Sequence, residues 1–492
     1  MKKITKTAIS LFFLIVLTGI FSYLVRMVFA RNLSIEEYGL FYAVLTFLLF
    51  FVPFRDLGLS EAIVYFISKY LAKKDLPSVK GVMILGGAIQ FFMGLVFVGI
   101  FYILRNFLAV NYFKNPISKT ILIILLVYYS FHSILPAISY IFLAHERLVK
   151  FKLSDLFNYG FVLVFSLVLF NTLENKALAP AYSYLLGQII AVVMFIIFLF
   201  VDFKWLFKES ARFSKSLLKE MFMYSLPIMF STAGMVVLSY SDIILLTLLK
   251  GTEVVGLYSV AYPSINVILL FILPLASVLF PRISRLHHLG DREGIKRIVY
   301  YIYNYFLMLC LPLGLMFFFY SDIIITVLFG AKYILATNAL RVFSIAFVFM
   351  ALREFNFAII AGVGKPKERS KILYIGVGVN IVLDLLLIPF YGATGAALGT
   401  GICCVLMAVL SSKIILKDYK AKIDYLLQAR IVLSSIVFSG VMFLAKYLLN
   451  FSSVIIESIL VLLISFLGYV GCLFIFKALN KDKMRIIKNI FF

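Results

Sequence analysis

Acidic residues are scarce in this sequence, and charged residues of either sign are few. Only 23 Asp and Glu stand against 46 Lys and Arg among 492 residues, and charged residues make up 14% of the chain while 63% are hydrophobic. An ordinary soluble domain carries about 25% charged and about 45–50% apolar residues. The composition therefore excludes a water-soluble globular protein and indicates that most of the surface faces lipid.

Residues that bind metals or nucleotides are also sparse. The four cysteines lie inside apolar runs, without the spacing of a metal site or a disulfide framework. His287 and His288 are adjacent, so on a helix they would point about 100° apart and would not share a metal. Gly364-Lys365 lacks the Ser or Thr that follows the lysine of a phosphate-binding loop. No Ser/His/Asp set stands in the short outward loops. We therefore expect no metal, no cofactor and no enzyme activity.

Long apolar runs recur along nearly the whole chain. A spanning helix needs about 20 mostly apolar residues, whereas strands of a membrane barrel alternate apolar and polar residues. The runs are continuously apolar, so the predicted fold class is an all-α integral membrane protein. We expect about fourteen transmembrane helices, near residues 8–30, 38–57, 80–105, 117–143, 152–173, 178–201, 220–249, 254–281, 297–320, 334–361, 370–391, 393–416, 425–449 and 453–477.

Basic residues give these helices a direction. If the N-terminus is cytoplasmic, 34 of the 46 Lys and Arg fall in cytoplasmic segments, 8 face outward and 4 lie within spans. This asymmetry follows the positive-inside rule and predicts that both termini lie in the cytoplasm of a cell-membrane protein. The net charge of +23 is then explained by anionic lipid headgroups, and no nucleic-acid partner is expected.

A weak internal repeat relates two outward loops. A shift of 217 residues places Ser34–Phe41 over Gly251–Tyr258, and the residues that coincide are Glu36 and Glu253, Gly39 and Gly256, and Leu40 and Leu257. The repeated unit has six helices, an even number, so both copies enter the membrane in the same direction. We predict two six-helix lobes in parallel repeat, residues 1–210 and 211–422, followed by two additional helices and a basic cytoplasmic tail in 423–492.

Ionisable side chains inside the predicted spans are the candidates for a site. A charge at the middle of a membrane costs about 2.5–3.5 kcal/mol on insertion scales, so it usually faces a cavity or a partner. Arginine binds phosphate oxygens through two hydrogen bonds, so an arginine-lined cavity suits a phosphate-bearing substrate. Snorkelling of Arg341 and mutual pairing of Arg55 and Asp56 remain open alternatives. The cavity candidates are Arg26, Arg353, Arg55 and Arg341, and the candidates for charge partners or ion coupling are Asp56, Asp242, Glu354 and Asp384.

An ordered set of short motifs resembles the polysaccharide-biosynthesis flippases, the Wzx-like and MurJ-like proteins of the multidrug/oligosaccharidyl-lipid/polysaccharide exporter superfamily. The resemblance extends over essentially the whole chain, and its motifs are Arg31-Asn-Leu-Ser-x-x-Glu-Tyr38-Gly39, Asp56-Leu-Gly-Leu, Gly256-Leu-Tyr258-Ser, Pro281-Arg-Ile-Ser, Leu328-Phe-Gly330-x-x-Tyr333, Gly364-Lys365 and Gly392-x-x-Gly395-Ala-Ala. Similar flippases carry cavity arginines in the first two helices, as Arg26 and Arg55 do here. Some also use an arginine in the eighth helix, which here is uncharged until Arg282, and this departure argues against a lipid II-type substrate.

The resemblance implies a flippase that moves a lipid-linked saccharide, on a polyprenyl-phosphate or pyrophosphate carrier, from the cytoplasmic to the outer leaflet by alternating access. It further implies a monomer that works beside membrane lipids and glycosyltransferases of the same pathway. Coupling to Na⁺, to H⁺ or to the membrane potential is left open. The alternative is a cation-coupled multidrug exporter of the same superfamily, although such exporters usually have twelve helices. A membrane glycosyltransferase would need a large outward loop or an acidic cluster, and this sequence has neither.

The first prediction concerns topology. Reporter fusions near Lys208, His288 and Lys417 should report the cytoplasm, because the basic residues concentrate there, whereas a fusion near Lys176 should report the outside. A single fusion on the opposite side would break the count of fourteen helices.

Overall fold

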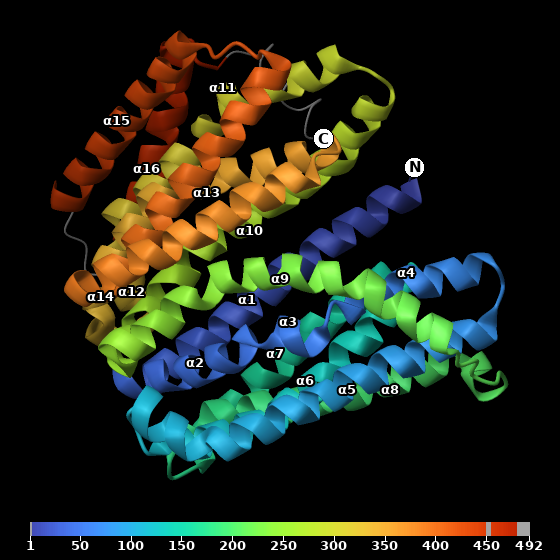
Figure 1. The fold of residues 1–492 in the computed structure, drawn as a ribbon. Coiled ribbons are helices and arrows are strands. Elements are labelled where there is room, and N and C mark those ends of the chain that lie inside the picture. The colour runs from blue at the N-terminus through green and yellow to red at the C-terminus, as the bar shows by residue number, and fades with distance from the viewer. Residues whose placement is uncertain (1, 449–453, 480–492) are drawn as a thin grey trace. The chain divides into compact units, whose positions relative to one another are not determined.

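A computed structural model describes residues 2–448 and 454–479, and over these residues every regular element is a helix (Figure 1). Twelve described helical segments are long and apolar enough to cross a membrane. One of them, α14 (Pro366–Tyr419), contains a reversal that makes it two spans, and α16 (Val454–Ile475) adds another apolar helix. The predicted all-α membrane class is confirmed. The predicted basic tail, from residue 480 onward, lies outside the described residues.

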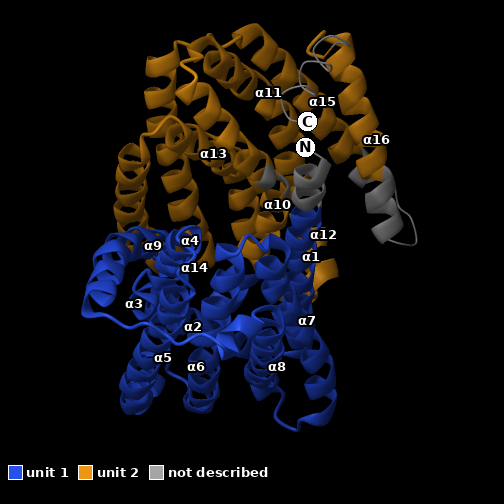
Figure 2. Cartoon of the chain, turned by 90° about the vertical axis from the view of Figure 1, so that its right-hand side faces the viewer, with its two compact units in different colours: residues 1–260 blue, residues 261–492 orange. Residues whose placement is uncertain are grey.

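The chain divides into two compact units, residues 1–260 and 261–492, and the division falls within α10 (Thr252–His288), as Figure 2 shows. In the first unit α1 packs against α7, α7 against α8, and α5 against α6. The predicted lobe boundaries at residues 210 and 422 describe the repeat rather than these units, and they remain a prediction. The helices of the first unit are α1 (Lys2–Asn32), α2 (Ile35–Phe50), α3 (Val52–Asp56), α4 (Leu59–Ala72), α5 (Leu76–Phe107), η1 (Leu108–Tyr112), α6 (Ile117–Ala144), α7 (Leu148–Thr172), η2 (Lys176–Leu178), α8 (Ala179–Asp202), η3 (Lys204–Phe207) and α9 (Lys215–Lys250).

The second unit holds most of α10 and the helices that follow it. In this unit α13 packs against α14, α11 packs against both α13 and α15, and α15 packs against α16. The two helices predicted to be additional, α15 and α16, are thus joined to the unit through α11. Its helices are α11 (Arg292–Phe319), α12 (Ser321–Phe329), η4 (Ala331–Ala336), α13 (Thr337–Gly362), α14, α15 (Tyr425–Leu448) and α16.

The start of α2 explains the polar residues of the first repeated motif. The hydroxyl of Ser34 accepts a hydrogen bond from the Glu37 amide (3.2 Å), and the Glu37 carboxylate accepts one from the Ser34 amide (2.8 Å). This reciprocal pair satisfies two amides that the helix end leaves free. Glu36 accepts a hydrogen bond from Asn115 in the loop before α6 (3.0 Å). These acids therefore begin a helix and fasten a loop.

Gly39 and Gly256 mark a close helix crossing within the first unit. A Cβ atom built on Gly39 would lie 1.8 Å from the carbonyl oxygen of Thr252, and one built on Gly256 would lie 2.3 Å from that of Ile35. The 217-residue shift relates Ile35 to Thr252 just as it relates the two glycines. The contact is therefore reciprocal, as a two-fold relation between equivalent segments requires. This geometry supports the internal duplication.

The helical run Ile35–Ala72 is longer than the span predicted near 38–57. The predicted span ends just after the charged pair Arg55 and Asp56. The chain instead bends at Leu57 and Gly58 and continues as α4. Gly58 has φ +72°, and a Cβ atom there would lie 2.3 Å from the carbonyl oxygen of Ser225 in α9. The bend therefore follows from a backbone contact that sequence periodicity does not reveal.

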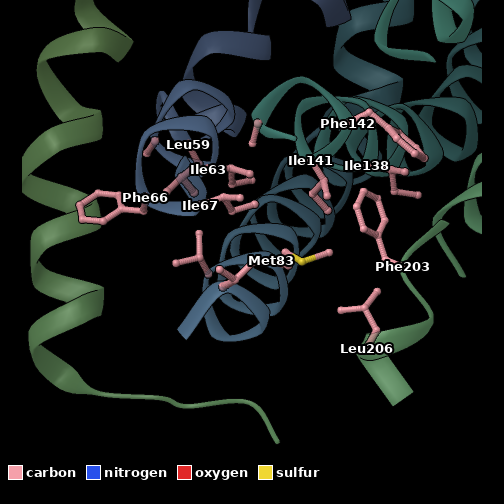
Figure 3. Packing of buried hydrophobic residues seen from close by; sticks show 14 of the residues in the cluster. Leu59, Ile63, Phe66, Ile67, Met83, Ile138, Ile141, Phe142, Phe203 and Leu206 are labelled. Atoms are coloured by element: carbon pink, nitrogen blue, oxygen red, sulfur yellow. The ribbon is translucent and has the colours of Figure 1, made fainter. Parts of the chain in front are cut away.

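The linker after α8 docks on the end of the first unit. Phe203 and Leu206 insert into an apolar cluster formed by α4, α5 and α6 (Figure 3). The ammonium of Lys80 donates to the carbonyls of Leu206 (2.6 Å) and Glu209 (2.8 Å). Because these contacts bury both ring and backbone, the linker is held to the unit along its length.

A surface ion pair completes this docking. Arg212 lies 3.2 Å from Asp75, which caps α5. Hydrogen bonds from Ser78 and the charge of Arg212 lower the pKa of Asp75 below its ordinary value. This contact is present above the ordinary carboxyl pKa and is lost as the pH falls through the lowered one.

Helix α14 folds back on itself at Gly392, whose φ of 53° and ψ of −127° break the helix. A Cβ atom on Gly395 would lie 2.4 Å from the Leu387 carbonyl oxygen, and one on Gly399 would lie 2.4 Å from Asp384 Oδ1. The glycines therefore let two antiparallel helices touch, as small residues do at close helix contacts. The reversal lies where two separate spans, 370–391 and 393–416, were predicted.

The crossing of Gly39 and Gly256 generates the second prediction. Gly39→Ala should lower the unfolding temperature in detergent, because overpacking typically costs about 1–3 kcal/mol. The matched control is Gly99→Ala, where a Cβ atom meets nothing within 4 Å. Alanine is favoured over glycine inside a helix by about 0.5–1 kcal/mol, so the control should be unchanged or slightly more stable. Equal unfolding temperatures for the two variants would contradict the crossing.

Candidate functional site

Arg26 lies on α1, half-buried, beside the buried residues Val25, Phe29 and Ala30. Its guanidinium carbon is 4.4 Å from the centre of the Tyr42 ring on α2, which is the geometry of a cation–π interaction. Among the described residues no carboxylate lies within 4.0 Å of Arg26. The charge of this arginine is therefore held by an aromatic ring instead of an acid.

One carbonyl anchors the guanidinium of Arg26. Arg26 donates a long hydrogen bond (3.5 Å) to the Ser259 carbonyl in α10, and the Tyr38 hydroxyl donates to the same oxygen (3.3 Å). This carbonyl lacks its usual intrahelical donor because Pro263, four residues on, has no N–H. Tyr38 can satisfy it alone, so Arg26 can turn to another acceptor at small cost.

Arg55 is enclosed, in contrast to Arg26. It is 2% exposed, and its guanidinium donates to the carbonyls of Tyr129 (3.2 Å) and His132 (3.4 Å) and contacts His132 Nδ1 (3.2 Å). Pro136 frees the His132 carbonyl in the same way that Pro263 frees Ser259. Arg55 therefore ties α3 to α6, and this geometry leaves it little freedom to meet a ligand.

Arg353 on α13 is paired with its neighbour in sequence. Its Nε and one terminal nitrogen donate to Glu354 Oε1 at 3.2 and 2.6 Å, and the other terminal nitrogen is 3.5 Å from Cys404 Sγ on α14. The side chains of Arg353 and Glu354 are 14% and 24% exposed. Arg353 would therefore bind a phosphate only in competition with Glu354, and its role in substrate binding remains a prediction.

Arg341 contacts the start of the short helix α12. Its Nε donates to the hydroxyl of Ser321 at 3.1 Å, and Ser321 is fully buried. The contact joins α13 to α12, a nine-residue helix that hydropathy alone does not predict. Its place in a substrate cavity also remains a prediction.

The acidic candidates of the first unit, Asp56 and Asp242, accept hydrogen bonds from uncharged side chains. Asp56 accepts hydrogen bonds from the Ser60 hydroxyl and from Gln90, both at 2.6 Å, and so connects the start of α4 to α5. No ion pair joins Asp56 to Arg55 within 4.0 Å among the residues that the structure describes, and the role of this neighbouring pair remains a prediction. Asp242 on α9 accepts a hydrogen bond from Tyr258 on α10.

The α14 hairpin gathers oxygen atoms around Asp384. Asp384 is fully buried and packs against Gly399, and Asn380, one turn away, donates to the Thr400 hydroxyl at 3.5 Å. Carboxylate, amide and hydroxyl oxygens are ligands for hard cations. The described residues contain no group of three His, Cys, Asp or Glu that could hold a metal ion. A coupling ion here would thus depend on the mixed oxygen set.

A family model for a polysaccharide biosynthesis protein matches residues 4–287, more than half of the chain. This chain belongs to the polysaccharide biosynthesis protein family. An uncharacterised membrane protein of Methanocaldococcus jannaschii is 32% identical over 396 residues, which cover 77% of each chain. A Haloferax volcanii protein described as a probable low-salt glycan biosynthesis flippase is 24% identical over 296 residues, or 60% of each chain.

The fold of this family member is shared with a solved flippase. The structure of the lipid II flippase MurJ in its inward closed conformation matches with a TM-score of 0.76 at 16% identity, over 95% of this chain and 98% of that one. A MatE family model also matches residues 227–386. The predicted membership of the exporter superfamily is confirmed, and with it the class of multi-pass membrane transporter.

The second unit of this family member carries an apolar groove. The groove has a volume of about 680 Å³ and lies between α11, α15 and α16, and its lining includes Tyr305, Leu309, Phe438, Phe466 and Tyr469. The hydroxyl of Tyr469 does not make the groove polar, because this hydroxyl donates a hydrogen bond to the carbonyl of Met308 at 2.8 Å. The additional helices therefore form one wall of a lipid-sized apolar site.

Sequence reasoning missed several groups that define the site. Tyr38 and Ser259 stand in motifs without an assigned role, and no pattern in the sequence singles out Tyr42 or His132. The signal was present, because a proline within a span identifies the carbonyl four residues earlier as one that needs a donor. The local sequence does not identify the side chain that supplies this donor.

The third prediction tests the contact of Arg55. Arg55→Met should lower the unfolding temperature, because a buried acceptor left without a donor costs about 1–3 kcal/mol. Arg285→Met, at an exposed position, serves as the control and should have little effect. In a Pro136→Ala background the helix regains an N–H for His132, so the same Arg55 substitution should cost less. Equal costs in both backgrounds would rule out the proline-freed carbonyl as the reason.

Proposed function

We propose that this chain flips a lipid-linked saccharide, carried on a polyprenyl phosphate or pyrophosphate, from the cytoplasmic to the outer leaflet by alternating access. The observation that carries this proposal is Arg26, a half-buried guanidinium with no carboxylate within 4.0 Å among the described residues and only a long hydrogen bond to a carbonyl that Tyr38 also satisfies. Such a group can accept a phosphate and release it again. Arg353 and Arg341 are the candidates for phosphate binding in the second unit.

The apolar groove of the second unit supports a substrate with a lipid part. Its walls are aromatic and aliphatic, and a volume of about 680 Å³ accommodates several isoprene units of a carrier chain. A saccharide without a lipid would gain nothing from such a wall. The relative of Haloferax volcanii that is named for glycan biosynthesis points to the same substrate class.

Transport of an anion to the outside can draw on the membrane potential. A negative charge that leaves a negative interior gains about 2.3 kcal/mol per 100 mV, so a cavity that binds the phosphate only transiently preserves this driving force. The oxygen atoms around Asp384 could instead couple transport to Na⁺ or H⁺. In this proposal the chain acts as a monomer in the cell membrane with both termini in the cytoplasm, supplied by glycosyltransferases.

The fourth prediction is a flipping assay with a lipid-linked oligosaccharide in vesicles. Arg26→Ala should reduce the rate by about 10- to 100-fold, because hydrogen bonds to a charged group are worth about 1.5–3 kcal/mol. Arg26→Lys should recover only part of the rate, since it loses the two-pronged geometry. Arg353→Ala should also slow transport, and Tyr38→Phe should do so by leaving Arg26 bound to the Ser259 carbonyl.

The control in this assay is Arg285→Ala, which removes an exposed charge. If Arg26→Ala and Arg353→Ala insert normally and flip at the parental rate, the phosphate cavity is refuted. Export of cationic drugs without movement of the lipid-linked saccharide would favour the alternative of a multidrug exporter, for which the MatE match to residues 227–386 is the supporting observation.

A further inference from the structure

The second unit contains a cavity lined by charged and apolar residues, none of which is a transport candidate. It has a volume of about 340 Å³ and is enclosed by the turn between α10 and α11, the turn between α13 and α14, and the end of α14. All three segments are predicted to face the cytoplasm. The side chains and turns that matter here belong to His287, Gly290, Arg292, Lys365, Asp418 and Tyr419.

The wall of this cavity has more positive than negative charge. Lys365 Nζ lies 2.6 Å from Asp418 Oδ2, whereas Arg292 donates to the backbone carbonyl of Asp418 at 2.5 Å. Both cations thus contact Asp418, Lys365 through the carboxylate and Arg292 through the uncharged backbone carbonyl. The Lys365 and Asp418 side chains are 45% and 31% exposed, so the excess charge is accessible.

The first unit has an ion pair of the same composition, but there both cations contact the carboxylate. Asp202, at the end of α8, pairs with both Arg147 and Lys150 and is 14% exposed. The Phe203 ring lies 4.8 Å from the guanidinium carbon of Arg147. Two cations contact one carboxylate directly, and the Arg147 and Lys150 side chains stay 39% and 35% exposed.

The repeat shows that these two ion pairs correspond. A shift of 217 residues places Leu148 on Lys365 and Val201 on Asp418, so each pair joins the same loop to the end of the same helix in its copy. Asp202 contacts both of its cations through its carboxylate, whereas Asp418 contacts Lys365 through its carboxylate and Arg292 only through its backbone carbonyl. Duplication alone accounts for the ion pair, but it does not account for the cavity and the unneutralised arginine beside it.

The second turn leaves space for a ligand to approach. A Cβ atom on Gly290 would meet nothing within 4 Å, and one on Gly364 would meet only His287 Nε2, at 4.0 Å. Gly290 lines the cavity, and Gly364 stands between its lining residues Val363 and Lys365. The lining also includes Leu286, Ile295 and Tyr419, but its ionic groups are two cations and one carboxylate, so a compact anion fits its size and its charge.

We propose that this cavity binds the phosphate of an anionic membrane lipid headgroup, with Arg292 and Lys365 as the cationic ligands. Basic pockets at the cytoplasmic ends of spanning helices are suited to such headgroups because the inner leaflet is anionic. The binding stands whether or not the chain transports saccharides. Because Lys365 lies in the turn between α13 and α14, the bound headgroup contacts this turn directly.

The test is a binding titration of the full chain in a neutral detergent, with a short-chain phosphatidylglycerol as the probe. Saturable binding is expected, and it should weaken with added salt. Arg292→Gln and Lys365→Gln should each weaken it by about tenfold or more, the effect of losing one hydrogen bond to a charged group. Lys152→Gln removes a charge from a surface pair in the first unit and should leave the affinity unchanged.

Asp418→Asn separates a binding site from a merely structural joint. Removing the competing carboxylate should strengthen phosphatidylglycerol binding, whereas a purely structural role predicts lower stability and no gain in affinity. The proposal is overturned if the parental protein shows no saturable binding, or if the Arg292 and Lys365 variants bind as the Lys152 variant does. Equal affinity for zwitterionic phosphatidylcholine, or binding of inorganic pyrophosphate without phosphatidylglycerol, also overturns the assignment to an anionic headgroup.

Discussion

Backbone carbonyls that prolines deprive of their donor organise the polar interior of this protein. In the hydrocarbon region no water replaces a missing N–H, so another helix has to supply a donor. At three prolines the donor is a long side chain from a distant part of the sequence. The three contacts are Arg55 on the His132 carbonyl, Arg26 with Tyr38 on the Ser259 carbonyl, and Tyr469 on the Met308 carbonyl.

The number of hydrogen-bond acceptors around each guanidinium distinguishes two arginines that look alike in the sequence. Arg55 contacts three acceptor atoms and has almost no exposed surface, so its guanidinium stabilises the contact between α3 and α6. Arg26 shares its single carbonyl with Tyr38, and its guanidinium otherwise rests on the Tyr42 ring. A cation that is stabilised but not neutralised is the state that a phosphate-binding group needs before its ligand arrives.

The predicted duplication relates two copies of the same joints, and the copies differ in their side-chain contacts. The reciprocal crossing of Gly39 and Gly256 remains symmetric because a carbonyl contact of this kind tolerates no side chain in either copy. The ion pairs of Asp202 and Asp418 need no such symmetry, since both cations contact the carboxylate in the first, while in the second Arg292 contacts a backbone carbonyl beside a cavity. Symmetry is therefore kept at the backbone and lost at the side chains.

Hydropathy, the positive-inside asymmetry and the motifs by themselves determined the all-α membrane class, the spans and the family, because each of these depends on local composition. The sequence also singled out eight charged residues within the spans as candidates for a site. It could not rank them, since Arg55 with Asp56 and Arg353 with Glu354 look equivalent as neighbouring pairs, yet only the second pair forms an ion pair within 4.0 Å among the described residues. That choice depends on which distant helix offers a carbonyl, a ring or an acid, and only tertiary packing brings those groups within reach.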